Sequence, residues 1–379
     1  MPRDGWIPAA FIRGGTSKGL FFEERELPGD PRCRDAFLLS AMGSPDPYGR
    51  QLDGMGGGLS SLSKAVIVAP SGRAGVDVDY TFAQIAIDRP IVDYSSNCGN
   101  LASAVGPFAV DQGVVERPDG AATVRMYNTN TGKTIDAHFE VADGTARVDG
   151  DLAIPGVGGA GAPVRLDFLD PGGSRTGRLL PSGAEAERID TRHGPIEASL
   201  VDAGNPVVFV TAEAAGIRGD ETVAELESLP GVLSRLEEVR CRAAVVMGLC
   251  ATPDGAPFAA PKVAVVAPPS AYSTLDGTPV GADAYDLSVR TISSGQVHRA
   301  IPVTTALCAA VADALPGTVV ARTARDRDGA LRIGSPSGVF ATEAEVDDDG
   351  RAVRASLYRT CRRLMQGSVP LRPESPLTG

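Results

Sequence analysis

The sequence predicts an α+β protein made of two pseudo-symmetric halves, each a strand-rich sheet wrapped around a central helix. One observation is a repeated strand pattern: residues 64–70 (KAVIVAP) return as residues 262–268 (KVAVVAP), 198 positions later (64 to 262). A second is a repeated serine pair, because residues 95–98 (SSNC) align with residues 293–296 (SSGQ) at the same spacing of 198 positions (95 to 293). Two motifs that share one spacing indicate that a whole structural unit is duplicated.

The third observation is a helical apolar pattern after each serine pair, which predicts helices over residues 98–112 and 296–315. We expect an N-terminal half over residues 1–185 and a C-terminal half over 186–379, whose last segment can pack back on the first half. Facing halves would bring both helix N-termini to an active-site cleft between them. Backbone N–H groups at such helix starts favour an anion.

Composition narrows the class of protein. A chain of 379 residues can bury two sizeable cores, and its net charge of −11 with few aromatics argues against nucleic acid as a partner. There is no run of 18 apolar residues and no signal-peptide pattern, so neither a membrane span nor a membrane partner is expected. Six scattered cysteines without a CxxC pair argue against zinc and against a disulfide framework. Together these features predict a cytoplasmic protein without a metal.

Lysine is rare in this chain. Of 36 basic residues only four are lysines, namely Lys18, Lys64, Lys133 and Lys262. In a chain so biased towards arginine, the lysines that remain are candidates for positions that need an amine with a tunable pKa, although chance retention is the simpler alternative. Lys64 and Lys262 each begin one of the repeated strands.

The elements follow in order along the chain. Residues 9–22 read as strand, turn and strand, and the turn holds Thr16, Ser17 and Lys18. Two hydroxyls beside a positive charge suit a carboxylate, although an ordinary hairpin turn would also explain them. Further predictions are a helix at 32–42, hairpins at 125–148, short helices at 222–229 and 232–240, a polar turn between strands at 333–340, and a final helix at 355–365.

A glycine-rich stretch precedes the first repeated strand. Residues 54–58 contain four glycines, among them Gly57, and Ser60 and Ser61 follow shortly before Lys64. Glycines there predict a backbone that something approaches closely, with N–H groups directed at an anion. A sugar-kinase phosphate loop is disfavoured, because a strand follows the serines where that loop would need a long helix.

Residues 95–101 are the stretch around which we expect the site to form. Ser96 or Asn97 is a plausible N-cap, which would place Cys98 in the first turn of a helix. That position favours the thiolate and lets the same turn hold a carboxylate, while Gly99 permits close approach to the backbone. The alternative is that Cys98 is a buried small apolar residue.

These residues favour proton transfer without a cofactor. Cys98 and Lys64 are the predicted acid/base pair, able to remove and return a proton next to a carboxylate. Gln296 takes the place of Cys98 in the second half and cannot carry a proton. This asymmetry favours allylic isomerisation, which shifts or isomerises a C=C bond, over racemisation. The predicted binding residues for the carboxylates are Thr16, Ser17, Lys18, Gly57, Ser60, Ser61, Asn97, Gly99, Asn100, Lys262, Ser294, His298, Arg299 and Ser335.

Three motifs resemble the PrpF family: residues 13–19 (RGGTSKG), 56–64 (GGGLSSLSK) and 96–108 (SNCGNLASAVGPF). That family includes 2-methylaconitate isomerases, 4-oxalomesaconate tautomerases and methylitaconate isomerases. The resemblance spans nearly the whole chain and implies the diaminopimelate epimerase-like fold. It also implies cofactor-independent proton transfer on an unsaturated di- or tricarboxylic acid, with acid/base groups at Lys64 and Cys98.

Two positions depart from the family pattern. Ser335 stands where members usually carry histidine, and Val297 stands where methionine is common. Either change could alter which acid is accepted. Two other functions stay open, an amino-acid epimerase of the same fold and a non-catalytic carboxylate-binding protein. The oligomeric state is also open, with a homodimer as one option.

Overall fold

The computed structural model describes residues 5–293 and 295–370, which form two compact units. Unit 2 is Asp167–Tyr358, and unit 1 comprises the chain before it and the chain from Arg359 on. The boundary expected between residues 185 and 186 therefore falls inside unit 2. The stretch from Asp167 to residue 185, which the sequence assigned to the first half, is part of unit 2. Asp202 holds it there by accepting hydrogen bonds from Ser174 Oγ at 2.5 Å and from the backbone N–H of Arg175 at 2.7 Å.

Unit 1 holds the first strands of the chain and its last one. Its elements are β1 (Trp6–Gly14), β2 (Ser17–Glu23), η2 (Glu24–Glu26), α1 (Pro31–Met42), η3 (Ser60–Leu62), β3 (Lys64–Pro70), β4 (Val78–Ile85), β5 (Val92–Asp93), α2 (Gly99–Asp111), β6 (Gly120–Asn128), β7 (Lys133–Ala142), β8 (Thr145–Ala146), β9 (Leu152–Ala153), β10 (Ala160–Gly161) and β23 (Cys361–Pro370).

Unit 2 contains the second set of strands and more helices. Its elements are β12 (Glu187–Thr191), β13 (Gly194–Asp202), β14 (Pro206–Thr211), α3 (Ala212–Ala215), α4 (Val223–Ser228), α5 (Val232–Val246), η4 (Pro253–Gly255), β15 (Lys262–Ala267), β16 (Tyr272–Ser273), β17 (Pro279–Val280), β18 (Leu287–Ser293), β19 (Gln296–Val297), α6 (Val303–Asp313), α7 (Val319–Thr323), β20 (Leu331–Ser335), β21 (Gly338–Val346) and β22 (Ala352–Arg359). The strand β11 (Val164–Leu169) spans one boundary between the units, and β22 ends on Arg359, the residue at which unit 1 resumes.

The two units repeat one strand order. In unit 1, β1 and β2 pair antiparallel, β2 and β3 parallel, β3 and β4 antiparallel, and β4 and β6 parallel. In unit 2 the same alternation runs through β13, β14, β15, β18 and β20. In each series one long helix follows an equivalent two-residue strand: α2 follows β5, and α6 follows β19. The predicted α+β fold with duplicated halves is confirmed.

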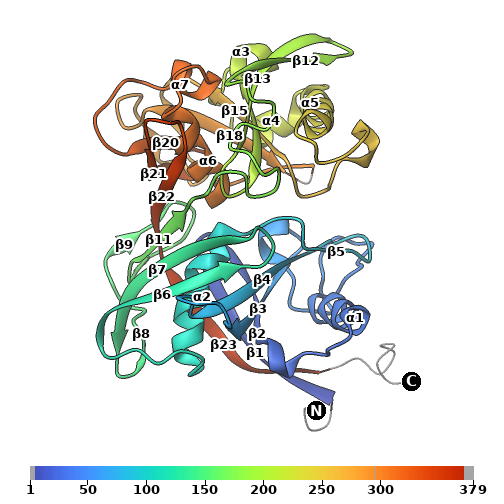
Figure 1. Ribbon diagram of the computed structural model, residues 1–379. Coiled ribbons are helices and arrows are strands. Elements are labelled where there is room, and N and C mark those ends of the chain that lie inside the picture. The colour runs from blue at the N-terminus through green and yellow to red at the C-terminus, as the bar shows by residue number, and fades with distance from the viewer. Residues whose placement is uncertain (1–4, 294, 371–379) are drawn as a thin grey trace. The chain divides into compact units, whose positions relative to one another are not determined.

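Both central helices are enclosed by the strands of their own unit (Figure 1). Every residue of α2 from Gly99 to Val110 is buried, and so is every residue of α6 from Val303 to Ala312. A helix that is apolar on all sides is stable only when it is covered on all sides. Gly106 shows how closely α2 is packed, since a Cβ there would lie 2.9 Å from the ring of Phe139 on β7.

The predicted helix over residues 296–315 is wrong in its first part. Gln296 lies in β19, which pairs antiparallel with β18 across a turn where Gly295 has φ 73°. The helix α6 begins only at Val303, after Pro302 as N-cap. The proline is the physical reason, because it disfavours helical dihedral angles at Ile301 and so prevents the helix from extending backwards.

The predicted final helix over residues 355–365 is also wrong. This segment forms β22 and the start of β23, where Leu357 pairs with Thr342 and Met365 pairs with Phe11. Its apolar residues fit helical spacing, but the strands β21 and β1 supply hydrogen-bond partners for an extended backbone, so tertiary pairing overrides the local pattern. Among the described residues, no helix is long and apolar enough to cross a membrane.

Candidate active site

Cys98 lies at the start of the central helix of unit 1. It is the N-cap of α2, one residue before the helix, whereas the sequence suggested Ser96 or Asn97 for this role. Its side chain makes no capping hydrogen bond. The thiol lies 3.9 Å from Ser17 Oγ on β2. The thiol is thus directed at the β1–β2 hairpin, with the first N–H groups of the helix next to it.

Lys64 is the first residue of β3, and only 8% of it is exposed. Its Nζ donates a hydrogen bond to Gln84 Oε1 at 2.5 Å and lies 4.9 Å from the centre of the Phe82 ring. Burial lowers the pKa of Lys64 below its ordinary value, and the charge of an ionised Cys98 opposes this by raising it. The lysine and the thiol therefore interact electrostatically, and Lys64 becomes a neutral base at a lower pH than an exposed lysine does.

The strand β4 supports both groups. Tyr80, Phe82 and Gln84 alternate along it and so project from the same face. The Tyr80 hydroxyl donates to Asn97 Oδ1 at 3.2 Å, and burial raises the pKa of Tyr80, which keeps it neutral. Sequence analysis missed these three residues. A two-residue alternation that places Tyr and Gln on the buried face of a strand was the available signal.

Asn100 joins the β1–β2 turn to the first turn of α2. Its Nδ2 donates to Thr16 Oγ1 at 3.1 Å, and its Oδ1 accepts from the Thr16 backbone N–H at 3.3 Å and from Arg359 Nε at 3.1 Å. Arg359 is 2% exposed, and burial lowers its pKa to about 9. Gly15 has φ 50°, and a Cβ there would lie 2.1 Å from Asn100 Oδ1, so glycine is required at this turn. Thr16 and Asn100 are therefore occupied with each other.

Lys18 does not join this cluster. Its Nζ lies 5.3 Å from the centre of the Phe11 ring on the neighbouring strand β1. Because adjacent residues of a strand project to opposite faces, Ser17 faces Cys98 while Lys18 faces away from it.

The glycine-rich stretch ends in the turn η3, directly before Lys64. Ser60 and Ser61 are half-buried in this turn, and Gly57 is exposed. The neighbouring glycines accommodate a buried side chain that sequence analysis missed, Gln51. A Cβ at Gly56 would lie 2.2 Å from Gln51 Oε1, the same oxygen that accepts from the Gly58 N–H at 3.0 Å. At least part of the glycine pattern is thus explained by packing within the loop.

The predicted residues of unit 2 lie at the ends of its strands. Lys262 begins β15 and is 8% exposed. His298 is half-buried and Arg299 exposed, and the Arg299 carbonyl accepts from Ser337 Oγ at 2.5 Å. Ser335 is 1% exposed and donates to the Gly338 carbonyl at 2.9 Å, within its own turn. The segment 298–299 and the β20–β21 turn are therefore neighbours, while Ser294 lies outside the described residues.

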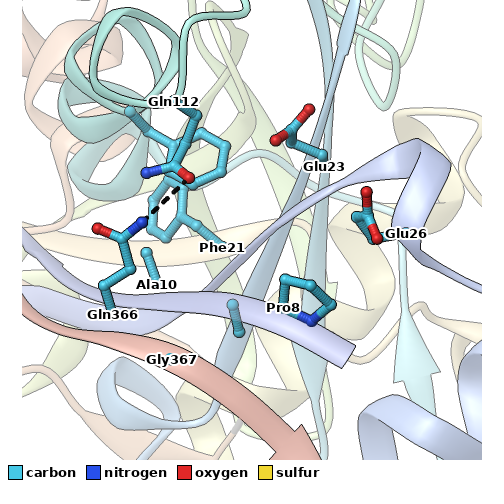
Figure 2. A pocket seen from close by; sticks show the side chains of 10 residues that line it. Pro8, Ala10, Phe21, Glu23, Glu26, Gln112, Gln366 and Gly367 are labelled. Atoms are coloured by element: carbon cyan, nitrogen blue, oxygen red, sulfur yellow. Dashed lines mark hydrogen bonds between the residues drawn. The ribbon is translucent and has the colours of Figure 1, made fainter. Parts of the chain in front are cut away.

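A pocket in unit 1 does not include these residues (Figure 2). It contains about 290 Å³ of empty space, part of it open to solvent, and Gln112 and Gln366 are hydrogen-bonded in its wall. Gln112 caps the C-terminal end of α2, so a helix of 13 residues, about 20 Å long, separates it from Cys98. Glu23 and Glu26 line the pocket, and their charge does not suit a polycarboxylate. In the described part of the chain, no cluster of His, Cys, Asp or Glu could hold a metal ion.

Several known proteins are similar to this chain over nearly its full length. A family model described as PrpF protein matches residues 5–372. The chain is 40% identical to the 3-methylitaconate isomerase of Eubacterium barkeri over 369 residues, covering 96% of each protein. It is 39% identical to the 2-methyl-aconitate isomerase of Shewanella oneidensis over 381 residues, again covering 96% of each.

Solved structures agree with these relatives. The crystal structure of a methylitaconate-delta-isomerase matches with a TM-score of 0.81 at 39% identity, covering 96% of this chain and 95% of that one. A hydroxyproline epimerase from Agrobacterium vitis matches with a TM-score of 0.55 at 13% identity, over 99% of this chain and 96% of that one, which shows a shared fold.

Proposed function

The chain belongs to the PrpF family, and from this premise we propose that it moves the C=C bond of an unsaturated di- or tricarboxylic acid. The predicted family and the predicted isomerase class are confirmed by the full-length relatives, which are named as isomerases. One relative is named for methylitaconate and the other for methylaconitate, at nearly equal identity. The identity of the acid is thus left to experiment.

The observation that carries the proposal is that unit 1 holds a buried lysine, Lys64, at the start of β3 and a thiol, Cys98, at the N-cap of α2, where the charge of the thiolate acts on the amine. One of the two groups removes a proton from a carbon next to the double bond, and the electron pair spreads into a dienolate. The other group returns a proton at the far end of that system, so the product has the composition of the substrate. The lowered pKa of Lys64 makes the neutral amine available at a lower pH than in an exposed lysine, and either group can act first.

Carboxylate binding is assigned to groups of three kinds. The N–H groups of Gly99 and Asn100 at the start of α2, together with nearby Asn97, offer backbone and amide donors. Ser17, Ser60 and Ser61 offer hydroxyls. Lys262, His298 and Arg299 of unit 2 are the basic residues that we propose for carboxylate binding.

Ser335 bears on the choice of acid. Its hydroxyl hydrogen is held by the Gly338 carbonyl, so it offers a substrate less than a histidine would at this position. We propose that this difference changes the acid that is preferred. We also propose that the protein acts in the cytoplasm and that a homodimer is compatible with its activity.

Proton NMR in deuterated buffer tests the function. Methylaconitate, aconitate, itaconate-type and oxalomesaconate-type acids are incubated with the wild type, Cys98→Ser and Lys64→Met. We expect isomerisation with deuterium uptake on at least one acid, slowed about 100-fold or more in both variants. Uptake that survives both substitutions would remove the acid/base assignment.

Two alternatives have distinct outcomes in the same experiment. Exchange at the α-carbon of an amino acid, without exchange on any unsaturated acid, would indicate an epimerase. An acid that raises the melting temperature without any exchange would indicate a binding protein.

A further inference from the structure

We propose that Gln84 is a positioning residue for Lys64, which aims the amine and ties it to the η3 turn. This inference rests on the proposed role of Lys64 in proton transfer. Gln84 is 7% exposed and lies directly opposite Lys64 in the antiparallel pair of β3 and β4. No motif of the family resemblance includes it.

The hydrogen bonds of Gln84 allow only one orientation of its amide. Nε2 donates to two backbone carbonyls, those of Ser60 at 3.1 Å and Ser63 at 2.9 Å. Carbonyl oxygens only accept, so Oε1 must point the other way, towards Lys64 Nζ. A flipped amide would place oxygen against two oxygens and NH₂ against an amine. The turn Ser60–Leu62 thus determines the direction in which Gln84 accepts.

An acceptor on one side of the amine has two consequences for a base. It holds one N–H of Lys64, so the lone pair of the neutral amine points elsewhere within a restricted range. It also stabilises the ammonium form, which opposes the effect of burial. Because Ser60 and Ser61 are proposed carboxylate ligands in the same turn, Gln84 connects substrate binding to the direction of the base.

The titratable groups on the elements around Lys64 differ in charge, and Tyr80, on the face of β4 that carries Gln84, is kept neutral by burial. Cys98 acts from the N-cap of α2. On the neighbouring strands, Glu23 of β2 pairs with Val68 and Asp79 of β4 pairs with Ala69, both towards the far end of β3. Gln84 is therefore the polar side chain hydrogen-bonded to Nζ at the reacting end of the strand.

The test follows the titration of Lys64 directly. Lysine labelled with ¹³C at Cε gives a spectrum of only four lysines, and the signal absent in Lys64→Met belongs to Lys64. We expect the titration midpoint of the Lys64 amine to fall in Gln84→Met, because this variant removes the hydrogen-bond acceptor. We expect the titration midpoint to rise by about one pH unit or more in Gln84→Glu, because this variant adds a negative charge. Thr81→Val, on the opposite face of β4, is the control and leaves the midpoint where it is in the wild type.

Kinetics supply the second readout. In Gln84→Met we expect kcat to fall about 10- to 100-fold while KM changes less than about threefold, because orientation is lost rather than binding. If Gln84→Met does not fold, Gln84→Asn replaces it, since its shorter amide cannot reach Nζ.

The assignment of Gln84 as a positioning residue would be overturned if the titration midpoint of Lys64 stayed unchanged in Gln84→Met and Gln84→Glu. It would also be overturned if the midpoint moved in the same direction in both variants. Failure of the proposed function looks different: the midpoints would move as expected, but Lys64→Met would keep its isomerase activity.

Discussion

Units 1 and 2 share a strand order but differ at the start of their central helices. Lys64 and Lys262 occupy equivalent positions, each as the first residue of a strand flanked by one parallel and one antiparallel neighbour, and each is 8% exposed. The N-cap of α2 is Cys98, whereas that of α6 is Pro302. The duplicated scaffold thus keeps a buried lysine in both units but places a thiol at the helix start in only one of them.

This difference supports an asymmetric reaction more firmly than the sequence alignment of the repeats did. The aligned counterpart of Cys98 was Gln296, but Gln296 lies in β19 and not at a helix start. The structural counterpart is Pro302, which also cannot transfer a proton. The argument for an asymmetric reaction therefore depends on Pro302 and not on Gln296.

The largest expected effect is a difference in kcat between variants of the two lysines, Lys64 and Lys262. Lys64→Met should lower kcat about 1,000-fold, in the range for loss of a general acid or base. Lys262→Met should mainly raise KM, because it removes a charge that we propose for carboxylate binding. Steady-state kinetics on the best acid measures both. Equal losses of kcat would mean that both units carry proton-transfer groups.

The thiol gives the next contrast. Cys98→Ser should lower kcat by about 100-fold or more, since a hydroxyl is a poor proton acceptor near neutral pH. Cys33→Ser, in the helix α1, is the matched control and should leave kcat unchanged. Activity retained in Cys98→Ser would place the second proton-transfer group elsewhere.

The loop before β3 is expected to depend on the buried side chain of Gln51. Its Nε2 donates to Ser44 Oγ at 2.8 Å and to Ser63 Oγ at 2.7 Å. Gln51→Ala should lower the free energy of unfolding of unit 1 by about 2–3 kcal/mol, because several buried partners are left unsatisfied. Urea unfolding followed by the fluorescence of Trp6 measures this. A change below 0.5 kcal/mol, taken as about the noise of surface substitutions, would contradict it.

Stability should also depend on pH through Lys64. Burial holds its folded pKa below 10.5, so between the two values the unfolded chain binds more protons. The free energy of unfolding then rises with pH in that window, by at most about 1.4 kcal/mol per pH unit. Lys64→Met should flatten the slope, and Thr81→Val should keep it. Urea titrations at several alkaline pH values test the sign.

The smallest effects concern the helices inserted between equivalent strands. Asp30 caps α1 in unit 1 by accepting from the N–H groups of Arg32 and Cys33, and Thr222 caps α4 in unit 2 in a capping box with Glu225. Alanine at either N-cap should cost about 1 kcal/mol. Thermal unfolding that shows a loss at one cap only would mean that the two insertions contribute unequally to their units.

Local signals explain what could be predicted. The helix α1 was expected at residues 32–42 and runs over Pro31–Met42, because Asp30, a proline and an apolar face mark it within one short segment. The β1–β2 hairpin and the turn between β20 and β21 were likewise expected from strand patterns around glycine. Cys98 and Lys64 were singled out as candidates from the polar and glycine-rich residues near them, and their role in proton transfer stays a prediction.

The wrong prediction of a final helix depended on segments far apart in the chain. Residues 355–365 carry a spacing that fits a helix, yet β22 and β23 pair with strands that the local pattern does not reveal. For the same reason sequence analysis missed Arg359, which binds Asn100 across 259 positions.

The amino-acid sequence by itself determined the duplicated α+β architecture, the family and the two residues proposed to move protons, since each is encoded by residues close together or by a repeated spacing. Only the tertiary structure decided that Gln84 lies opposite Lys64, that Asn100 is held by Thr16 and Arg359, and that Lys18 turns away from Cys98. These outcomes depend on strand register and burial. Both arise when distant segments pair, and neither is visible in the spacing of neighbouring residues.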